Sequence, residues 1–218
     1  MENCLKCSSK LIKYGKNTTG KQKYKCINCK RCSLKSYTYK ACYPEISQFI
    51  LSHLKESCSV RGIARLANIS TTTVANRIKS LSRNIKPPLM RFGRSYELDE
   101  MRTYVGNKDN IYWVIYAIDK LTKEIVLLRV GKRNKTTVKK VTDLLLLSNP
   151  KEIYTDKLGL YKTLIPSYTH KTKKGGINHI ERKNLTLRTH IKRLSRRTIC
   201  YSKSAIMLKN SVELYVWG

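Results

Sequence analysis

Four cysteines near the start of the chain have the spacing of a metal site. Cys4 and Cys7 ("CLKC") and Cys26 and Cys29 ("CINC") form two CxxC pairs with 18 residues between them. Each pair can turn two thiolates toward one point, and two pairs complete the tetrahedral S₄ site that zinc prefers. Because metal binding can fold a segment that is too small for its own core, the spacing predicts a structural Zn²⁺ site.

Cys32 extends the second pair to CxxCxxC and is an alternative to Cys29, although the symmetry of two CxxC pairs favours Cys29. The segment between the pairs predicts a short β-ribbon with turns at Gly15 and Gly20. The other three cysteines are expected to be buried thiols. They are Cys42, Cys58 and Cys200.

Three carboxylates offer a second, different metal chemistry. Asp99 lies within a predicted strand, Asp156 ends another, and Glu181 lies on a predicted helix. Mg²⁺ prefers oxygen ligands, and three carboxylates can hold two ions about 4 Å apart for in-line attack on a phosphodiester. Any one of these acids could instead be an ordinary surface charge. Their positions together predict a catalytic two-metal Mg²⁺ site.

The elements around these acids predict an α/β fold. Strands are expected at 94–106, 110–120 and 123–131, a helix at 136–148, further strands at 150–156 and 167–172, and a helix at about 178–197. This order is typical of a ribonuclease H-like domain with a mixed sheet. In that fold the first and fourth strands are neighbours, so Asp99 and Asp156 should converge.

The last predicted helix should bury one apolar stripe and carry polar side chains on its flank. The stripe comprises Ile180, Leu187, Ile191 and Leu194, and the flank comprises Glu181, Asn184, Arg188 and Lys192. Strand alternation puts Glu97 on the face of Asp99, as a substitute ligand, and Glu100 on the opposite face. Asp119 is expected in a hairpin turn, where aspartate is common.

Residues 41–86 predict a helix-turn-helix. Apolar residues repeat at helical spacing around Ile46–Leu54, Val60–Ala67 and Val74–Leu81, and "NIS" forms a turn with an N-cap at Ser70 or Thr71. The small Ala64 allows the close helix packing of this motif. The third helix would present polar side chains to the major groove or its phosphates. These are Thr71, Thr72, Thr73, Asn76, Arg77 and Lys79.

The charge of the chain favours a polyanionic partner. The 218 residues include 45 Lys and Arg but only 14 Asp and Glu, a formal net charge of +31. Both parts are basic, with net charges of +15 for residues 1–90 and +16 for residues 91–218. Nucleic acid is the favoured partner. An anionic membrane surface fits less well, because the basic residues do not follow one amphipathic face. Without an apolar run of about 20 residues or a signal-peptide pattern, a cytoplasmic protein is expected.

Beyond these local features, the sequence resembles the bacterial insertion sequence 1 transposases over nearly its whole length. "CLKC…KYKCINCK" is similar to the zinc finger of that family and "SVRGIARLANISTTTV" to its helix-turn-helix. "ELDEMRTYVG", "WVIYAIDK" and "YTDKLGLY" are similar to its catalytic strands. "IERKNLTLRTHIKRLSRRTICYSKS" is similar to its glutamate-bearing helix, and is the most specific match.

The resemblance implies a transposase with a zinc finger (residues 1–40), a helix-turn-helix domain (41–86) and a ribonuclease H-like DDE catalytic domain (87–218). It implies an acidic triad of Asp99, Asp156 and Glu181, with Arg188 contacting DNA. The implied activity is Mg²⁺-dependent cleavage at the terminal inverted repeats and strand transfer to target DNA, by a dimer or larger assembly at the bacterial nucleoid. A non-catalytic DNA-binding regulator and a metal-dependent nuclease of the same fold are the alternatives.

Overall fold

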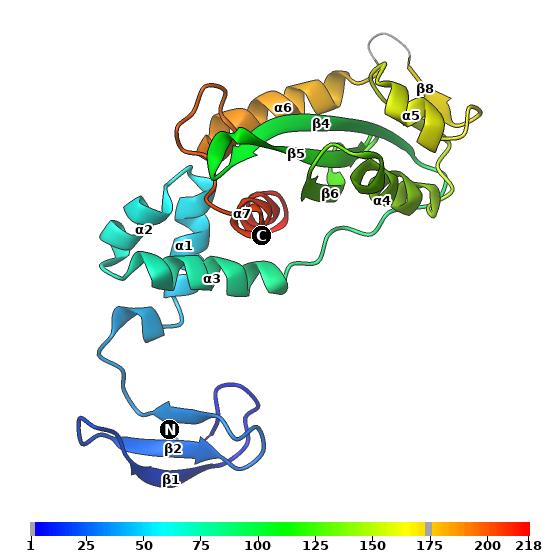
Figure 1. The fold of residues 1–218 in the computed structure, drawn as a ribbon. Coiled ribbons are helices and arrows are strands. Elements are labelled where there is room, and N and C mark those ends of the chain that lie inside the picture. The colour runs from blue at the N-terminus through cyan, green and yellow to red at the C-terminus, as the bar shows by residue number, and fades with distance from the viewer. Residues whose placement is uncertain (1–2, 173–175) are drawn as a thin grey trace. The chain divides into compact units, whose positions relative to one another are not determined.

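A computed structural model describes residues 3–172 and 176–218, and the chain divides into two compact units, Met1–Ile46 and Ser47–Gly218. Figure 1 shows the elements of both units. Residues 47–86 thus belong to the same compact unit as residues 87–218.

The first unit is a small antiparallel sheet. Its strands are β1 (Leu11–Lys16), β2 (Gln22–Cys26) and β3 (Cys32–Leu34), in that spatial order, followed by the short 3₁₀-helix η1 (Lys40–Cys42). The predicted β-ribbon is confirmed. Gly20 lies in the β1–β2 turn with a φ of +78°, whereas Gly15 (φ +66°) lies inside β1, where the pairing register shifts between Lys13 and Lys16. Gly15 therefore forms a bulge and not a turn, because a bulge residue with positive φ favours glycine.

The second unit begins with three helices at the predicted positions. They are α1 (Ile46–Lys55), α2 (Val60–Ala67) and α3 (Thr71–Arg83). Ser59 caps α2 by accepting a bond from the Gly62 N–H, and Ser70 caps α3 by accepting one from the Thr73 N–H, both at 3.0 Å. Between them Asn68 adopts the left-handed conformation that ends α2.

A mixed five-stranded sheet follows. Its strands are β4 (Ser95–Val105), β5 (Asn107–Asp119), β6 (Ile125–Gly131), β7 (Glu152–Tyr154) and β8 (His170–Lys171). The spatial order is β6-β5-β4-β7-β8, with β4–β5 and β5–β6 antiparallel and β4–β7 and β7–β8 parallel. The expected adjacency of the first and fourth strands is confirmed by the β4–β7 pairing.

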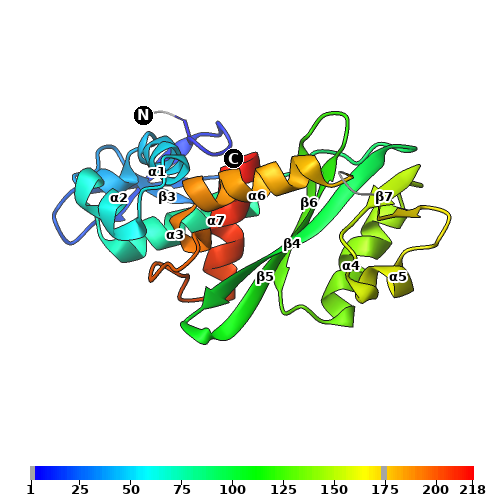
Figure 2. The same ribbon diagram turned by 90° about the horizontal axis from the view of Figure 1, so that it is seen from above.

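Helices cover both faces of this sheet. Figure 2 shows α6 (Asn178–His190) and α7 (Ala205–Trp217) on one side of β4 and β5, and α4 (Lys135–Leu146) and α5 (Gly159–Leu164) on the other. Each side has its own buried cluster. Met101 and Tyr116 pack with α6 and α7, whereas Leu98 and Ile115 pack with α4 and α5. Because successive side chains of a strand point to opposite faces of the sheet, the position of each acid in β4 determines which face it lies on.

Three helical features differ from the sequence-based prediction. α6 ends at His190 and not near residue 197, because Ile191 is extended and a 3₁₀-turn, η2 (Lys192–Leu194), follows. The apolar stripe is nevertheless buried as predicted, since Ile191 and Leu194 remain in the cluster with Ile180 and Leu187. The helices α5 and α7 were not predicted. Among the described residues, no helix has the length and apolar character needed to cross a membrane.

Candidate active site and candidate metal centre

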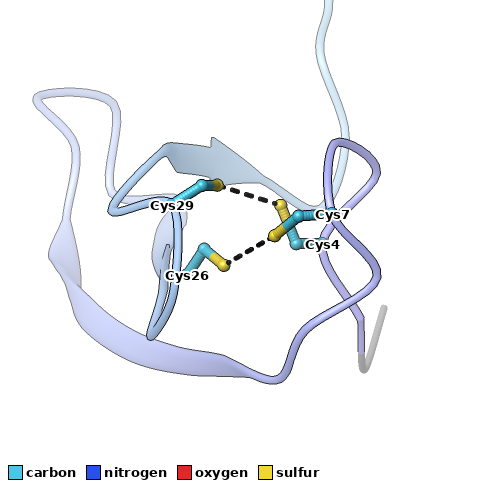
Figure 3. Close-up of side chains that lie close together, drawn as sticks. All are labelled: Cys4, Cys7, Cys26 and Cys29. Carbon is cyan, nitrogen blue, oxygen red and sulfur yellow. Dashed lines mark hydrogen bonds between the residues drawn. The ribbon is translucent and has the colours of Figure 1, made fainter.

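The two CxxC pairs meet in the first unit. The Sγ atoms of Cys4 and Cys29 are 3.6 Å apart and those of Cys7 and Cys26 are 3.4 Å apart, and all four lie within 4.8 Å of one another (Figure 3). A tetrahedral zinc ion with bonds of about 2.3 Å requires sulfur–sulfur distances of roughly 3.8 Å. The four thiols can therefore hold zinc.

Backbone donors around the cluster favour thiolates. The Lys6 N–H donates to Cys4 Sγ at 3.4 Å and lowers the pKa of Cys4. The backbone N–H of Ser9, followed by its hydroxyl and the Cys26 thiol, lowers the pKa of Cys7 to about 6. Since thiolates are the species that bind zinc, these donors prepare Cys4 and Cys7. The Arg31 N–H acts in the same sense on Cys29, but burial and the neighbouring thiols outweigh it and raise the pKa of Cys29 to about 11. The CxxC spacing places these N–H groups close to the sulfur atoms, because only two residues separate the cysteines of each pair and the backbone must turn tightly there.

The cluster takes Cys29 and not Cys32, which is exposed in β3. The expectation that the remaining cysteines are buried is wrong. Cys42 and Cys200 are exposed and Cys58 is half-buried, because they lie in a 3₁₀-turn, a loop and the α1–α2 connection, which have one side open to solvent.

Asp99 lies within β4, and Asp156 follows the end of the adjacent parallel strand β7. The pairing runs from Ser95↔Glu152 to Glu97↔Tyr154, and two residues further along the chain from the last pair are Asp99 and Asp156. Asp99 accepts a hydrogen bond from the Glu100 N–H at 2.8 Å, and Asp156 accepts one from the Leu158 N–H at 3.0 Å. The Asp156 carboxylate is thereby held just beyond the carboxyl end of β7, beside the middle of β4, which carries Asp99.

The helix α6 brings the third acid to the same face. Asn184, one turn after Glu181, donates from Nδ2 to Asp99 Oδ2 at 2.6 Å and accepts from the Tyr116 hydroxyl at 2.8 Å. Burial raises the pKa of Asp99, and the charges of Asp156 and Glu181 raise it further. Asp156 and Glu181 therefore both act electrostatically on Asp99. Glu181 is exposed, so the site is open on the side of α6.

The carboxylates are not as tightly gathered as the thiols. Within residues 3–172 and 176–218, only the four cysteines form a group of three or more metal-binding side chains whose ligand atoms all lie within 4.8 Å of one another. The carboxylate donors have the oxygen chemistry that Mg²⁺ prefers. Holding a shared ion requires that their oxygens approach more closely.

Glu97 and Glu100, the acids on either side of Asp99, are both bonded within the fold. Glu97 is fully buried and accepts bonds from two residues of α6, which agrees with its predicted place on the face of Asp99. Glu100 lies on the opposite face, as predicted, where Tyr161 and Arg133 contact it. Asp119 accepts bonds from the N–H groups of Leu121 and Thr122 in the β5–β6 turn, as expected.

The two basic residues predicted to accompany Glu181 separate at the end of α6. Arg188 is half-buried, and its Nη1 donates a hydrogen bond to the Leu194 carbonyl at 3.1 Å. Burial lowers the pKa of Arg188, whereas the charge of Asp99 acts to raise it. Lys192 lies beyond the helix, in η2, and is exposed. The expected common flank is wrong for Lys192, because the helix ends before Ile191, whereas Glu181 and Arg188 both lie on α6.

The predicted DNA-contacting side chains of the third helix lie between Thr71 and Lys79 of α3. Thr72, Asn76 and Lys79 are exposed, and Thr73 and Arg77 are half-buried. The Thr73 hydroxyl lies 2.8 Å from the Ser70 hydroxyl and thus supports the N-cap. Ala64 of α2 is buried, as its proposed packing role requires.

The family of the chain follows from comparison with known proteins. The model of the IS1 transposase family matches residues 94–216, which include Asp99, Asp156, Glu181 and all five strands of the larger sheet. Because this match covers more than half of the chain, the protein belongs to the IS1 transposase family. The resemblance noted in the sequence is confirmed.

Individual relatives agree. The insertion element iso-IS1n protein InsB of Shigella dysenteriae is 40% identical over 120 residues, which are 55% of this chain and 92% of that protein. The insertion element IS1 2 protein InsB of Escherichia coli strain K12 is 36% identical over 108 residues, 50% of this chain and 65% of that protein. The match therefore spans slightly less than two thirds of the Escherichia coli relative.

Among solved structures, similarity is weak. A chain of the simian T-cell lymphotropic virus intasome in complex with the PP2A regulatory subunit B56 gamma has a TM-score of 0.38 and 17% identity, over 77% of this chain and 67% of that one. A score of this size does not establish a shared fold.

Proposed function

We propose that this protein is a DNA transposase of the DDE type. It binds the terminal inverted repeats of an insertion sequence, cleaves DNA strands there and joins the ends to target DNA. The observation that carries the proposal is that Asp99 of β4 and Asp156, just after the neighbouring β7, lie near α6, which bears Glu181, inside the region matched by the transposase family.

In this proposal Asp99, Asp156 and Glu181 hold Mg²⁺. Mg²⁺ bound by these carboxylates would supply activation of the attacking hydroxyl and stabilisation of the departing oxygen of the phosphodiester. Asn184 orients Asp99 through its 2.6 Å bond, and Tyr116 in turn orients Asn184. Arg188, which is close enough to Asp99 for their charges to interact, contacts a DNA phosphate beside the carboxylates.

The sheet order and the three helices support the finer parts of the proposal. The order β6-β5-β4-β7-β8, with the first three strands antiparallel and the last two parallel, favours a ribonuclease H-like catalytic domain. The capped helices α2 and α3, joined by a short turn, favour a helix-turn-helix that reads the inverted repeat. The cysteine cluster favours a zinc finger that contributes to DNA binding.

The charge supports DNA as the partner, since a net charge of +31 suits a phosphate backbone. Two element ends must be held together during transposition, so a dimer or larger assembly on DNA is part of the proposal. A bacterial transposase of this kind would act in the cytoplasm, at the nucleoid.

The experiment compares the full chain with Asp156→Ala and with Asp143→Ala, an exposed acid of α4 paired only with Lys139. Mg²⁺-dependent nicking and strand transfer are measured on duplexes with cognate element ends, and binding is measured by gel shift. We expect Asp156→Ala to lower cleavage about a thousandfold, since a metal ion supplies several kcal/mol of transition-state stabilisation. Binding should persist, and Asp143→Ala should cleave normally.

Other outcomes separate the alternatives. Binding without cleavage by the wild type would favour a DNA-binding regulator. Cleavage without joined products would favour a nuclease of the same fold. Cleavage that survives Asp156→Ala would refute the assigned triad.

A further inference from the structure

The strand β4 carries three acids within four residues, and they have three different environments. Asp99 faces the candidate metal centre. Glu97, two residues earlier, faces α6, and Glu100 points through the other face of the sheet toward α5. The other two candidate ligands, Glu181 and Asp156, lie at the beginning of α6 and just before α5.

Glu97 binds the first turn of α6. Its side chain is fully buried; Oε2 accepts a bond from the Ile180 N–H at 2.8 Å, and Oε1 lies 2.6 Å from His179 Nδ1. Ile180 is the residue before Glu181. A carboxylate at a helix N-terminus satisfies an otherwise unpaired N–H and interacts favourably with the helix dipole, so Glu97 fixes the part of α6 that carries Glu181.

Glu100 binds α5 from the opposite face. Its side chain is 4% exposed; the Tyr161 hydroxyl donates to Oε2, and Arg133 Nη1 lies 3.5 Å from Oε1. Tyr161 is fully buried in the first turn of α5. Asp156 is tied to the same turn, because it accepts the N–H of Leu158, the N-cap residue of α5.

Burying these two acids is costly, and nothing in helix packing alone requires it. A desolvated carboxylate loses several kcal/mol of hydration that its partners must return, and apolar side chains would hold α5 and α6 on a sheet without that loss. Moreover, the charges of Asp99 and Asp156 act unfavourably on Glu100. What the acids provide is a directional bond from β4 to each segment.

We propose that Glu97 and Glu100 are positioning residues that fix Glu181 and Asp156 relative to Asp99, so that a single strand sets the geometry of all three metal ligands. The inference rests on the proposed metal-dependent function of this site. Neither residue touches the metal or DNA in this role. Each acts through the helix segment that it holds, as outer-shell groups orient the ligands of metal sites.

The test uses the full chain with two matched pairs of variants. Tyr161→Phe removes only the hydroxyl bonded to Glu100; its control is Tyr96→Phe, an equally buried tyrosine whose hydroxyl donates to the Arg91 carbonyl. Glu97→Gln leaves one acceptor oxygen for two donors; its control is Glu213→Gln, a buried acid bonded to Ser82 and Lys209. Asp99→Ala identifies binding at the proposed centre.

Two readouts are taken. The free Mn²⁺ signal in electron paramagnetic resonance gives the affinity for Mn²⁺, and hydrogen exchange by mass spectrometry reports the segments 156–164 and 176–184. We expect about tenfold weaker Mn²⁺ binding in Tyr161→Phe and in Glu97→Gln, with affinity in both controls within twofold of the wild type. Hydrogen exchange should accelerate in segment 156–164 of Tyr161→Phe and in segment 176–184 of Glu97→Gln. The same segments should exchange at the wild-type rate in the matched controls, Tyr96→Phe and Glu213→Gln.

Unchanged Mn²⁺ affinity in both test variants, or the same loss in their controls, would overturn the positioning role. If Mn²⁺ binding does not depend on Asp99, the proposed metal centre itself fails. Hydrogen exchange then still tests whether β4 holds the segments 156–164 and 176–184. Equal exchange rates in the test and control variants would overturn this holding role as well.

Discussion

Asp99 shows how one residue is prepared for its role. Both of its oxygens accept hydrogen bonds, one from the Glu100 N–H and one from Asn184, so its orientation is fixed before any ligand binds. Burial beside Asp156 and Glu181 raises its pKa and makes its charged form less favourable. A cation at this position would relieve that repulsion, which is a physical reason for a divalent ion to bind here.

The choice between Cys29 and Cys32 gives a prediction at the same scale. Cys29→Ser should lose about one zinc ion per chain and unfold the first unit, because zinc-binding free energy is folding free energy in such small segments. Cys32→Ser should keep its zinc, since Cys32 lies outside the cluster. Zinc content by atomic absorption and the dispersion of amide NMR signals check both. Equal zinc loss in the two variants would contradict the ligand assignment.

At the scale of elements, α7 joins the three-helix segment to the larger sheet. It packs on α3 and β6, and Ser82 of α3 donates hydrogen bonds to Asn210 at 3.2 Å and to Glu213 at 3.0 Å. Trp217 Nε1 donates to the Ile125 carbonyl of β6 at 2.7 Å. The same helix thus contacts the proposed DNA-reading helix and the larger sheet.

We predict that Ser82→Ala lowers the free energy of unfolding by about 1–2 kcal/mol, because it removes two buried hydrogen bonds and leaves acceptors of α7 unpaired. Ser80→Ala, at an exposed position of the same helix, should change it by less than about 0.5 kcal/mol. Urea denaturation followed by circular dichroism measures both. Equal stability of the two variants would show that this network does not hold α3 on α7.

The strand β8 gives a pH-dependent prediction. His170 Nε2 lies 2.7 Å from the Thr155 hydroxyl, and burial, with a smaller effect of Lys162, lowers the pKa of His170. The unfolded chain therefore binds this proton more tightly than the folded one. Its contribution to stability is present above the unfolded pKa of about 6.5 and is lost as the pH falls toward the folded pKa.

His170→Gln should therefore show a smaller decrease in melting temperature between pH 7 and pH 5 than the wild type does. Calorimetry at several pH values measures this difference. An identical pH profile for both proteins would exclude His170 as the titrating group.

At the scale of the whole molecule, positive charge is the dominant feature. Both compact units carry excess Lys and Arg, and the formal net charge of the chain is +31. Within residues 3–172 and 176–218, the basic side chains of Arg94, Arg133, Lys139 and Lys209 each lie within 4.0 Å of a carboxylate oxygen. The basic side chains thus far outnumber the acids available to pair with them, and a polyanion is required to neutralise them.

Affinity for DNA should accordingly fall by about 10³- to 10⁵-fold between 50 and 200 mM salt, as expected for a protein that contacts six to ten phosphates. Fluorescence anisotropy with a labelled duplex measures the slope of log affinity against log salt. A flat response would exclude phosphate contacts as the main source of affinity.

Local spacing in the sequence was enough to determine several features. The CxxC pairs, the capping Ser70 of α3, the apolar stripe of α6 and the alternation around Asp99 each depend on residues a few positions apart. Short-range geometry limits such patterns to few conformations. The adjacency of β4 and β7 was expected on a different ground, because the order of strands and helices along the chain is typical of a fold in which the first and fourth strands are neighbours.

Only the tertiary structure decided which distant groups meet. The hydrogen-bond partners of Glu97 and Glu100 are 61 to 83 residues away in the chain, and no local pattern distinguishes these buried acids from the exposed Glu181. The end of α6 at Ile191 and the packing of α7 on α3 likewise depend on contacts made across the core. Sequence spacing supplied the candidate ligands, whereas long-range packing determined how they are held, because burial and pairing depend on neighbours in space.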